Sequence, residues 1–241
     1  VQGFASLSRL RCNTSPITQE RTCRSSAFLS ASKNSFATDG VLYRQSVCTK
    51  EEMKEIQQEI DQAMKQVSDE RSSIAQGRMG ATLSQDCEIA KILQQGCIFS
   101  LAQRAVSGET NSKLVLAKEI PIEMRIYEKT GASMAWHRDD VLYDPPQLEV
   151  VFTVENTSDC VTMWKVGDDL YSQETHPNSL VLLRAGGPEH CVTSLKRGRR
   201  VILKCAYTME GAKFVGEDYQ NQFQEARGKK AKGKRKQRAK S

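Results

Sequence analysis

Trp136-His137-Arg138-Asp139-Asp140 contains one of the three histidines of the chain, and a second, His190, follows 51 residues after Asp139. Alternate residues of a β-strand share a face, so on a strand His137 and Asp139 point the same way and Arg138 points away. Two histidines and one carboxylate leave three positions open on a bound metal, which suits non-haem Fe(II) and oxygen chemistry. Zinc accepts the same ligand types, but its sites favour tetrahedral closure or one open position. The sequence therefore predicts an iron site formed by His137, Asp139 and His190.

These residues also have simpler interpretations. His137 and Asp139 on a surface strand would form an ion pair, and His190, after the turn Gly186-Gly187-Pro188, would be a structural loop histidine. The spacing of the three residues and the arginines that follow His190 favour the metal site. Asp140 replaces Asp139 as a ligand only if a β-bulge shifts the register. The third histidine, His176, is expected in a solvated loop, and Trp136 in the core or the wall of a pocket.

The region 113–207 around this motif is expected to consist of short strands. Its apolar runs are separated by turns and not by helices, which indicates an antiparallel sandwich or barrel. With the run 41–44, the expected strands number about eight, and the others are 114–116, 123–127, 134–137, 148–154, 161–166, 179–183 and 201–207.

Helices are expected before the strands. Thr49 and Glu52 have the spacing of a capping box, and apolar residues then recur every three or four positions as far as Val67. Residues 71–84 contain Gly77 and Gly80 and are expected to form a loop. A second helix is predicted over 86–106, although Gly96 within it weakens the case for one continuous helix. The predicted fold class is α+β, mainly β, with a barrel over 113–207 buttressed by two N-terminal helices over 49–106.

Two arginines follow His190 at the start of a predicted strand, after Gly198. A fixed guanidinium near an Fe(II) site can pair with the far carboxylate of a dicarboxylate cosubstrate in a bidentate fork. Adjacent residues of a strand face opposite ways, so either Arg199 or Arg200 points inward. Alternation carries Val201 and Leu203 inward with Arg199, or Ile202 and Lys204 inward with Arg200, and it does not choose between them.

Taken together, these segments resemble the iron(II)/2-oxoglutarate-dependent dioxygenases, and most closely their prolyl-hydroxylase-like branch. The resemblance rests on Met124-Arg125-Ile126-Tyr127, Gly131, Trp136-His137-Arg138-Asp139, Pro188-Glu189-His190-Cys191-Val192 and Gly198-Arg199-Arg200. It spans about 120–207, and the strand and helix at 40–67 are also typical of the family. A lone H-x-D is a weak signal, but H-x-D, a histidine about 50 residues later and a G-x-R are specific in a β-rich context.

The resemblance implies a double-stranded β-helix, a jelly-roll or cupin-like barrel, in which His137, Asp139 and His190 bind Fe(II). It assigns the cosubstrate's basic residue to Arg200, with Arg199 as runner-up. It also implies contacts from Tyr127 and, as a weaker match, Thr153. The implied cosubstrates are 2-oxoglutarate and O2, with ascorbate as a further cofactor to test. Arginine stands where many prolyl hydroxylases have lysine, which leaves the substrate class open.

The two ends differ in composition from the middle of the chain. Residues 1–38 carry a net charge of +4 and residues 227–241 carry +9, which leaves −7 for residues 39–226 out of a formal total of +6. Residues 1–38 match a transit peptide or a disordered leader. Residues 211–241 are expected to be a disordered basic tail, in which 227–241 could contact nucleic acid or the ribosome or act as a nuclear import signal. Between these ends, residues 39–210 form the predicted dioxygenase domain.

The location expected is intracellular, in a plastid or mitochondrion if 1–38 is a transit peptide and otherwise in the nucleus or cytoplasm. The eight cysteines include no C-x-x-C pair, which gives zinc-ribbon and thioredoxin-like sites no support and favours free thiols. No stretch approaches the roughly 20 apolar residues of a membrane span, so no membrane partner is expected.

The function predicted is a 2-oxoglutarate-dependent hydroxylase of a protein side chain or a small molecule, coupled to decarboxylation of 2-oxoglutarate to succinate. Two alternatives remain open. One is an oxidative nucleic-acid demethylase of the same superfamily, which the basic tail motivates. The other is a catalytically inactive barrel that serves as a binding module.

Overall fold

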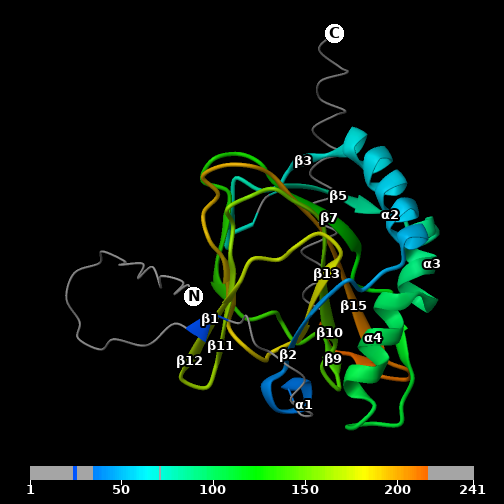
Figure 1. Ribbon diagram of the computed structural model, residues 1–241. Helices are drawn as coiled ribbons and strands as arrows, with labels where there is room; N and C mark the ends of the chain where they lie inside the picture. Colours follow the sequence, from blue (N-terminus) through cyan, green and yellow to red (C-terminus); the bar gives the residue numbers. More distant parts are fainter. Residues whose placement is uncertain (1–23, 26–34, 71, 217–241) are drawn as a thin grey trace, which may run out of the picture.

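Two sheets face each other in the computed structural model, which describes residues 24–25, 35–70 and 72–216 (Figure 1). Their strands pair antiparallel, except for one parallel pair at an edge of the smaller sheet. The larger sheet has eight strands and the smaller has six. In Figure 1 the smaller sheet lies on the left, the larger in the middle and the long helices on the right. No helix of the described part is long and apolar enough to cross a membrane.

The larger sheet runs in the order β2-β13-β10-β15-β7-β5-β3, with β6 also paired to β15. Its strands are β2 (Val41–Gln45), β13 (Ser179–Arg184), β10 (Leu148–Asn156), β15 (Arg200–Met209), β7 (Ile122–Tyr127), β5 (Met79–Leu83), β3 (Ser68–Asp69) and β6 (Leu114–Leu116). The smaller sheet runs β1-β12-β11-β14-β8-β4. Its strands are β1 (Arg24–Ser25), β12 (Asp169–Gln173), β11 (Thr162–Val166), β14 (His190–Val192), β8 (Ser133–His137) and β4 (Ala75–Gln76). A separate pair joins β9 (Tyr143–Asp144) to β16 (Lys213–Phe214).

Helix α2 (Lys50–Ala63) begins at the predicted capping box. The Glu52 amide donates to Thr49 Oγ1 at 3.1 Å, and the Thr49 amide donates to Glu52 Oε2 at 2.9 Å. The other oxygen of Glu52 accepts from the Cys97 amide at 2.9 Å, at the start of α4. One carboxylate therefore satisfies backbone donors at the beginnings of two helices, where negative charge is favourable.

The single helix predicted over 86–106 is wrong, because Gly96 divides it into α3 (Glu88–Gln95) and α4 (Cys97–Val106). Gly96 is extended, with φ −83° and ψ −164°. A Cβ atom there would lie 2.5 Å from Glu52 Oε1 and 2.6 Å from the Ile92 carbonyl oxygen. The helical support therefore consists of α2, α3 and α4, and not of two helices. A short helix, α1 (Ser35–Asp39), precedes β2.

The main hydrophobic core lies between these helices and one face of the larger sheet. Val201, Leu203 and Cys205 of β15 belong to the same buried cluster as Ile56 and Ile60 of α2. The α3 and α4 members of that cluster are Ile89, Ala90, Ile92, Leu93, Ile98, Ala102 and Val106. Because residues alternate along a strand, the opposite face of β15 points between the two sheets.

The strands expected from apolar runs are present, with ends shifted by up to two residues. The loop predicted over 71–84 is wrong, since it contains β4 and β5. Short polar or glycine-containing segments give little strand signal, and here pairing to β8 and β7 determines their conformation. Strands β12 and β14 were also missing from the sequence prediction, because β12 is largely polar and β14 has only three residues.

The described structure crosses both predicted domain boundaries. Helix α1 lies largely within the predicted leader 1–38, and Phe36 in it is buried. Strand β16 lies within the predicted tail 211–241. Most of the predicted leader 1–38, and the whole basic run 227–241, lie outside the described residues.

Gly80 of β5 allows Arg125 of the neighbouring strand β7 to cross it. A Cβ atom at position 80 would lie 2.5 Å from the Met124 carbonyl oxygen and 2.6 Å from Arg125 Nη1. Arg125 in turn forms ion pairs with Glu70 and Glu123, so it is not free to swing away. The glycine is needed here for close approach of neighbouring atoms and not for an unusual φ.

Gly80→Ala should lower the free energy of unfolding by about 1–3 kcal/mol, the typical cost of overpacking. Urea denaturation of the two proteins measures the difference. Gly108→Ala is the matched control, since a Cβ atom there meets no atom within 4 Å. Equal stability of the Gly80→Ala and Gly108→Ala proteins would contradict this account.

Candidate metal centre

The pairing of β8 with β14 brings the two site histidines together. His137 is the direct partner of His190, and Met134 is the partner of Val192. From Met134 to His137, β8 therefore advances three residues while β14 advances two. The extra residue on β8 forms a β-bulge at Ala135 and Trp136. Without it, alternation would place Met134 and His137 on opposite faces.

The bulge re-aims His137 into the space between the sheets. Met134 also lies inside, where its sulfur is 3.1 Å from Arg78 Nη1. Trp136 is left on the outside with 41% of its surface exposed, so of its two expected places the core is wrong. There Lys165 Nζ lies 4.5 Å from the centroid of the indole ring.

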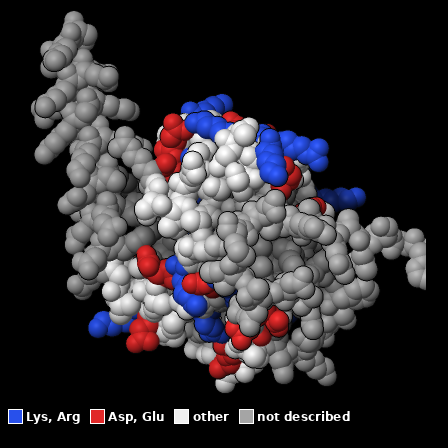
Figure 2. Space-filling model, turned by 90° about the vertical axis from the view of Figure 1, so that its left-hand side faces the viewer, with Lys and Arg blue, Asp and Glu red and all other residues white. Residues whose placement is uncertain are grey.

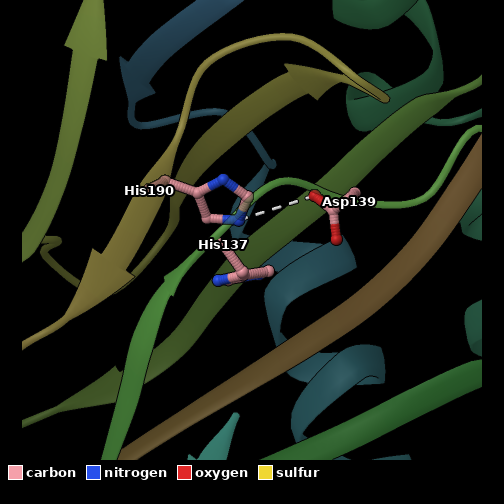
Figure 3. Close-up of side chains that lie close together, drawn as sticks. All are labelled: His137, Asp139 and His190. Atoms are coloured by element: carbon pink, nitrogen blue, oxygen red, sulfur yellow. Dashed lines mark ion pairs between the residues drawn. The ribbon is translucent and has the colours of Figure 1, made fainter.

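His137, Asp139 and His190 converge on one point (Figure 3). One ligand atom from each residue lies within 4.8 Å of the others. Asp139 Oδ2 is 3.5 Å from His190 Nε2, the contact drawn as a dashed line in Figure 3. The structure thus gathers the three residues that the sequence proposed as ligands. The exposed Asp140 lies outside this group, because the bulge precedes His137 and leaves Asp139 facing inward.

The backbone fixes the tautomer of each histidine. His137 Nδ1 lies 2.9 Å from the Ala135 carbonyl oxygen, and His190 Nδ1 lies 3.2 Å from the Pro188 carbonyl oxygen. A carbonyl only accepts, so each neutral ring carries its proton on Nδ1 and a lone pair on Nε2. His137 Nε2 is buried without a hydrogen-bond partner among the described residues. These are the atoms that a divalent metal requires, so the site fits an Fe(II) ion.

Burial sets the protonation of the site. Burial lowers the pKa of His190 to about 4, against the opposing effect of Asp139, so the ring is neutral near pH 7. Burial alone would raise the pKa of Asp139, but Lys204 and the two histidines hold it below its ordinary value. His190 and Asp139 therefore offer a neutral imidazole and a carboxylate.

Lys204 of β15 is a contact that the sequence did not assign to the site. Its Nζ donates to Asp139 Oδ1 at 2.9 Å and lies 3.5 Å from Glu149 Oε2. Gln147 Nε2 donates to the other oxygen of Glu149 at 3.0 Å. Lys204 thereby occupies one oxygen of Asp139, while the other faces His190. The sequence signal for this contact was the alternation that couples Lys204 to an inward Arg200.

Arg200 and Arg199 lie in opposite environments. Arg200 is fully buried, and its Nε, Nη1 and Nη2 have no hydrogen-bond partner among the described residues. Arg199 is on the outer side, with Nη1 3.2 Å from Glu155 and Nε 3.4 Å from Glu128. Burial lowers the pKa of Arg200 from its ordinary value, and neighbouring Arg78 acts in the same direction. A guanidinium stays charged in proteins, so Arg200 is a buried cation in need of an anion.

Tyr127 and Thr153 share the interior with Arg200. Tyr127 is the direct cross-strand partner of Arg200, and its ring centroid lies 5.6 Å from the Arg200 guanidinium carbon. Thr153 is the partner of Ile202 on β15, and its buried hydroxyl has no hydrogen-bond partner in the described structure. His176, by contrast, is exposed in the loop between β12 and β13, as expected.

Charged side chains on the face nearest β11 and β12 are of both signs. Figure 2 shows basic and acidic groups interspersed over the described part of this surface, without one large patch of a single sign. A basic stripe of the kind that follows a nucleic-acid backbone does not appear on this described face.

Comparisons with known proteins find likeness in shape but not in sequence. No family model and no curated protein matches the chain. A prolyl-4-hydroxylase of Pseudomonas putida superimposes with a TM-score of 0.56 at 14% identity, over 72% of this chain and 95% of that chain. A prolyl hydroxylase of Trichoplax adhaerens, solved with a peptide fragment of a hypoxia inducible factor, gives 0.60 at 15% identity over 74% and 87%.

A third similar structure is HygX of Streptomyces hygroscopicus, solved with nickel, 2-oxoglutarate and hygromycin B. Its TM-score is 0.53 at 12% identity, over 71% of this chain and 84% of that chain. At these identities the comparisons establish the fold. The mainly-β barrel predicted from the sequence is confirmed, and it is the fold of solved 2-oxoglutarate- and Fe(II)-dependent oxygenases, prolyl hydroxylases among them.

His137→Ala should weaken Co(II) binding by more than about 100-fold, because loss of a ligand costs more than loss of an outer hydrogen-bond partner. Calorimetric titration of the metal-free protein measures this. His176→Ala removes the third histidine from an exposed loop and should leave the affinity unchanged. If both variants bound Co(II) as the parent does, the triad would not be a metal site.

Proposed function

We propose that this protein is an Fe(II)- and 2-oxoglutarate-dependent dioxygenase that hydroxylates a protein side chain or a small molecule. The observation that carries the proposal is that one barrel contains two sites, each of which lacks a binding partner. One is the ligand set of His137, Asp139 and His190, and the other is the buried, unpartnered guanidinium of Arg200. A metal completes the first, and a carboxylate completes the second.

A dicarboxylate cosubstrate fits this arrangement. 2-Oxoglutarate has one end that chelates iron and a far carboxylate that needs a cation. Iron and 2-oxoglutarate, when bound, supply the oxidation, in which one oxygen atom of O2 enters the substrate and the other enters succinate as carbon dioxide is released. The fold shared with solved 2-oxoglutarate oxygenases supports this choice of cosubstrate.

The residues of the chain have separable tasks in this reaction. His137, Asp139 and His190 hold the metal, and the carbonyl oxygens of Ala135 and Pro188 keep both rings oriented. Lys204 keeps Asp139 ionised and occupies one of its oxygens, while the other oxygen faces His190. Arg200 and Tyr127 bind the far carboxylate in a site from which water is excluded, since neither side chain is exposed. Exclusion of water strengthens each of these contacts.

The candidate substrates include both proteins and small molecules. Among the similar structures, one holds a peptide fragment and another holds hygromycin B. Both a peptide and a small molecule are therefore candidates.

The test of the proposal is anaerobic addition of 2-oxoglutarate to the Fe(II)-loaded protein. A visible charge-transfer absorption is expected, and admission of air should then release succinate. Absence of both signals from a protein that has bound Fe(II) would refute the proposal. Partners trapped by an Asp139→Ala variant, and hydroxylated only by the parent protein, would identify the substrate by mass spectrometry.

Arg200→Met should weaken 2-oxoglutarate binding by about 100-fold, since two charge-assisted hydrogen bonds of about 1.5 kcal/mol each correspond to that factor. It should not lower the melting temperature of the ligand-free protein, because it removes an unpaired buried charge. Calorimetry on the Mn(II)-loaded protein and thermal unfolding measure the two effects. Arg199→Met is the matched control and should retain the parent affinity, and the reverse order of the two variants would assign the cation to Arg199.

A further inference from the structure

Arg78, Tyr127 and Arg200 lie in a row across β15, β7 and the residue that precedes β5. Tyr127 of β7 is the direct partner of Arg200 on β15. Arg78 immediately precedes Met79, which pairs with Ile126, so the same register places Arg78 beside Tyr127. The guanidinium carbons of Arg78 and Arg200 lie 5.5 Å and 5.6 Å from the centroid of the Tyr127 ring. One phenol ring is therefore shared by two arginines.

The two arginines differ in how their charge is compensated. Glu70 accepts from Arg78 Nε at 2.5 Å and from Nη2 at 2.7 Å, using both of its oxygens. Both side chains are largely buried, with 7% and 13% of their surface exposed. Such a bidentate pair is strong and fixes the plane of the guanidinium. Arg78 is therefore held in place by Glu70, whereas Arg200 has no hydrogen-bonded anion among the described residues.

The fixed guanidinium of Arg78 determines where the Tyr127 hydroxyl can point. Arg78 Nη1 donates to Tyr127 Oη at 2.9 Å. A guanidinium cannot accept a hydrogen bond, so the hydroxyl proton must point elsewhere. The other contact recorded for this hydroxyl is the Met134 sulfur at 3.9 Å, which is a weak acceptor. The proton is thus available to a stronger acceptor beside Arg200.

We propose that Arg78, held by Glu70, is a positioning residue for the cosubstrate, which it serves by turning the Tyr127 hydroxyl proton toward the carboxylate that Arg200 binds. The inference rests on the proposed function. Arg78 itself does not contact the bound 2-oxoglutarate in this proposal. Its contribution passes through Tyr127, as donation to a hydroxyl oxygen strengthens the hydrogen bond that the same hydroxyl donates.

The contacts from Glu70 through Arg78 to Tyr127 also connect the surroundings of Arg200 to a segment that pairs with both sheets. Strand β3 pairs with β5 of the larger sheet, and β4 pairs with β8 of the smaller sheet. Glu70 and Arg78 lie on this segment, just after β3 and just before β5. The segment that joins the two sheets therefore also sets the orientation of Tyr127.

A double-mutant cycle on the Mn(II)-loaded protein tests the proposal. The dissociation constant of 2-oxoglutarate is measured by calorimetry for the parent, Arg78→Met, Tyr127→Phe and the double variant. Arg78→Met should weaken binding about 5- to 10-fold when Tyr127 is present, and less than about 2-fold when position 127 is Phe, since the coupling requires the hydroxyl. Arg78→Lys keeps the charge without the fork and should give an intermediate loss.

The outcomes separate this inference from the proposed function. If the parent protein does not bind 2-oxoglutarate, the proposed function fails, and the inference fails with it. If the parent binds and Arg78→Met has the same effect with either residue at position 127, or no effect, the inference alone is overturned. Should Arg78→Met fail to fold, Arg78→Lys replaces it in the same cycle, with circular dichroism as the check on folding.

Discussion

The out-of-register pairing of β8 with β14 is the constraint on which the candidate centre depends. A regular ladder would place His137 outside whenever Met134 is inside, since side chains alternate across a sheet. One extra residue on β8 removes that conflict and leaves Trp136 on the surface. The backbone carbonyl of Ala135, within the same bulge, then fixes the His137 ring. The bulge thus both points the His137 side chain inward and sets the tautomer of its ring.

The buried cations of the barrel differ in whether a carboxylate of the chain pairs with them. Lys204 lies between the carboxylates of Asp139 and Glu149, and Arg78 is paired with Glu70. Arg200 is more deeply buried than either and has no such partner among the described residues. Because an unpaired buried charge is costly, a carboxylate bound at Arg200 would remove that cost, in line with the proposed function.

Much of the fold could be predicted because it depends on local patterns. The capping box at Thr49 and the apolar strands of the barrel each have a signal in neighbouring residues. The elements that were missed are stabilised by distant partners. Strand β5 depends on β7, and the break at Gly96 depends on Glu52, which lies on another helix. Propensity is a weak guide wherever tertiary contacts determine the conformation.

The sequence by itself determined the candidate ligand set, because an H-x-D and a distant histidine are properties of residue type and spacing. It also limited the cation proposed to bind the cosubstrate to Arg199 or Arg200. Only the tertiary structure placed Arg200 inside, since alternation allows either face and packing against the helices decides between them. The contacts of Lys204 with Asp139 and of Arg78 with Tyr127 join residues far apart in the chain. Such contacts arise from the pairing of strands, which no local stretch of sequence specifies.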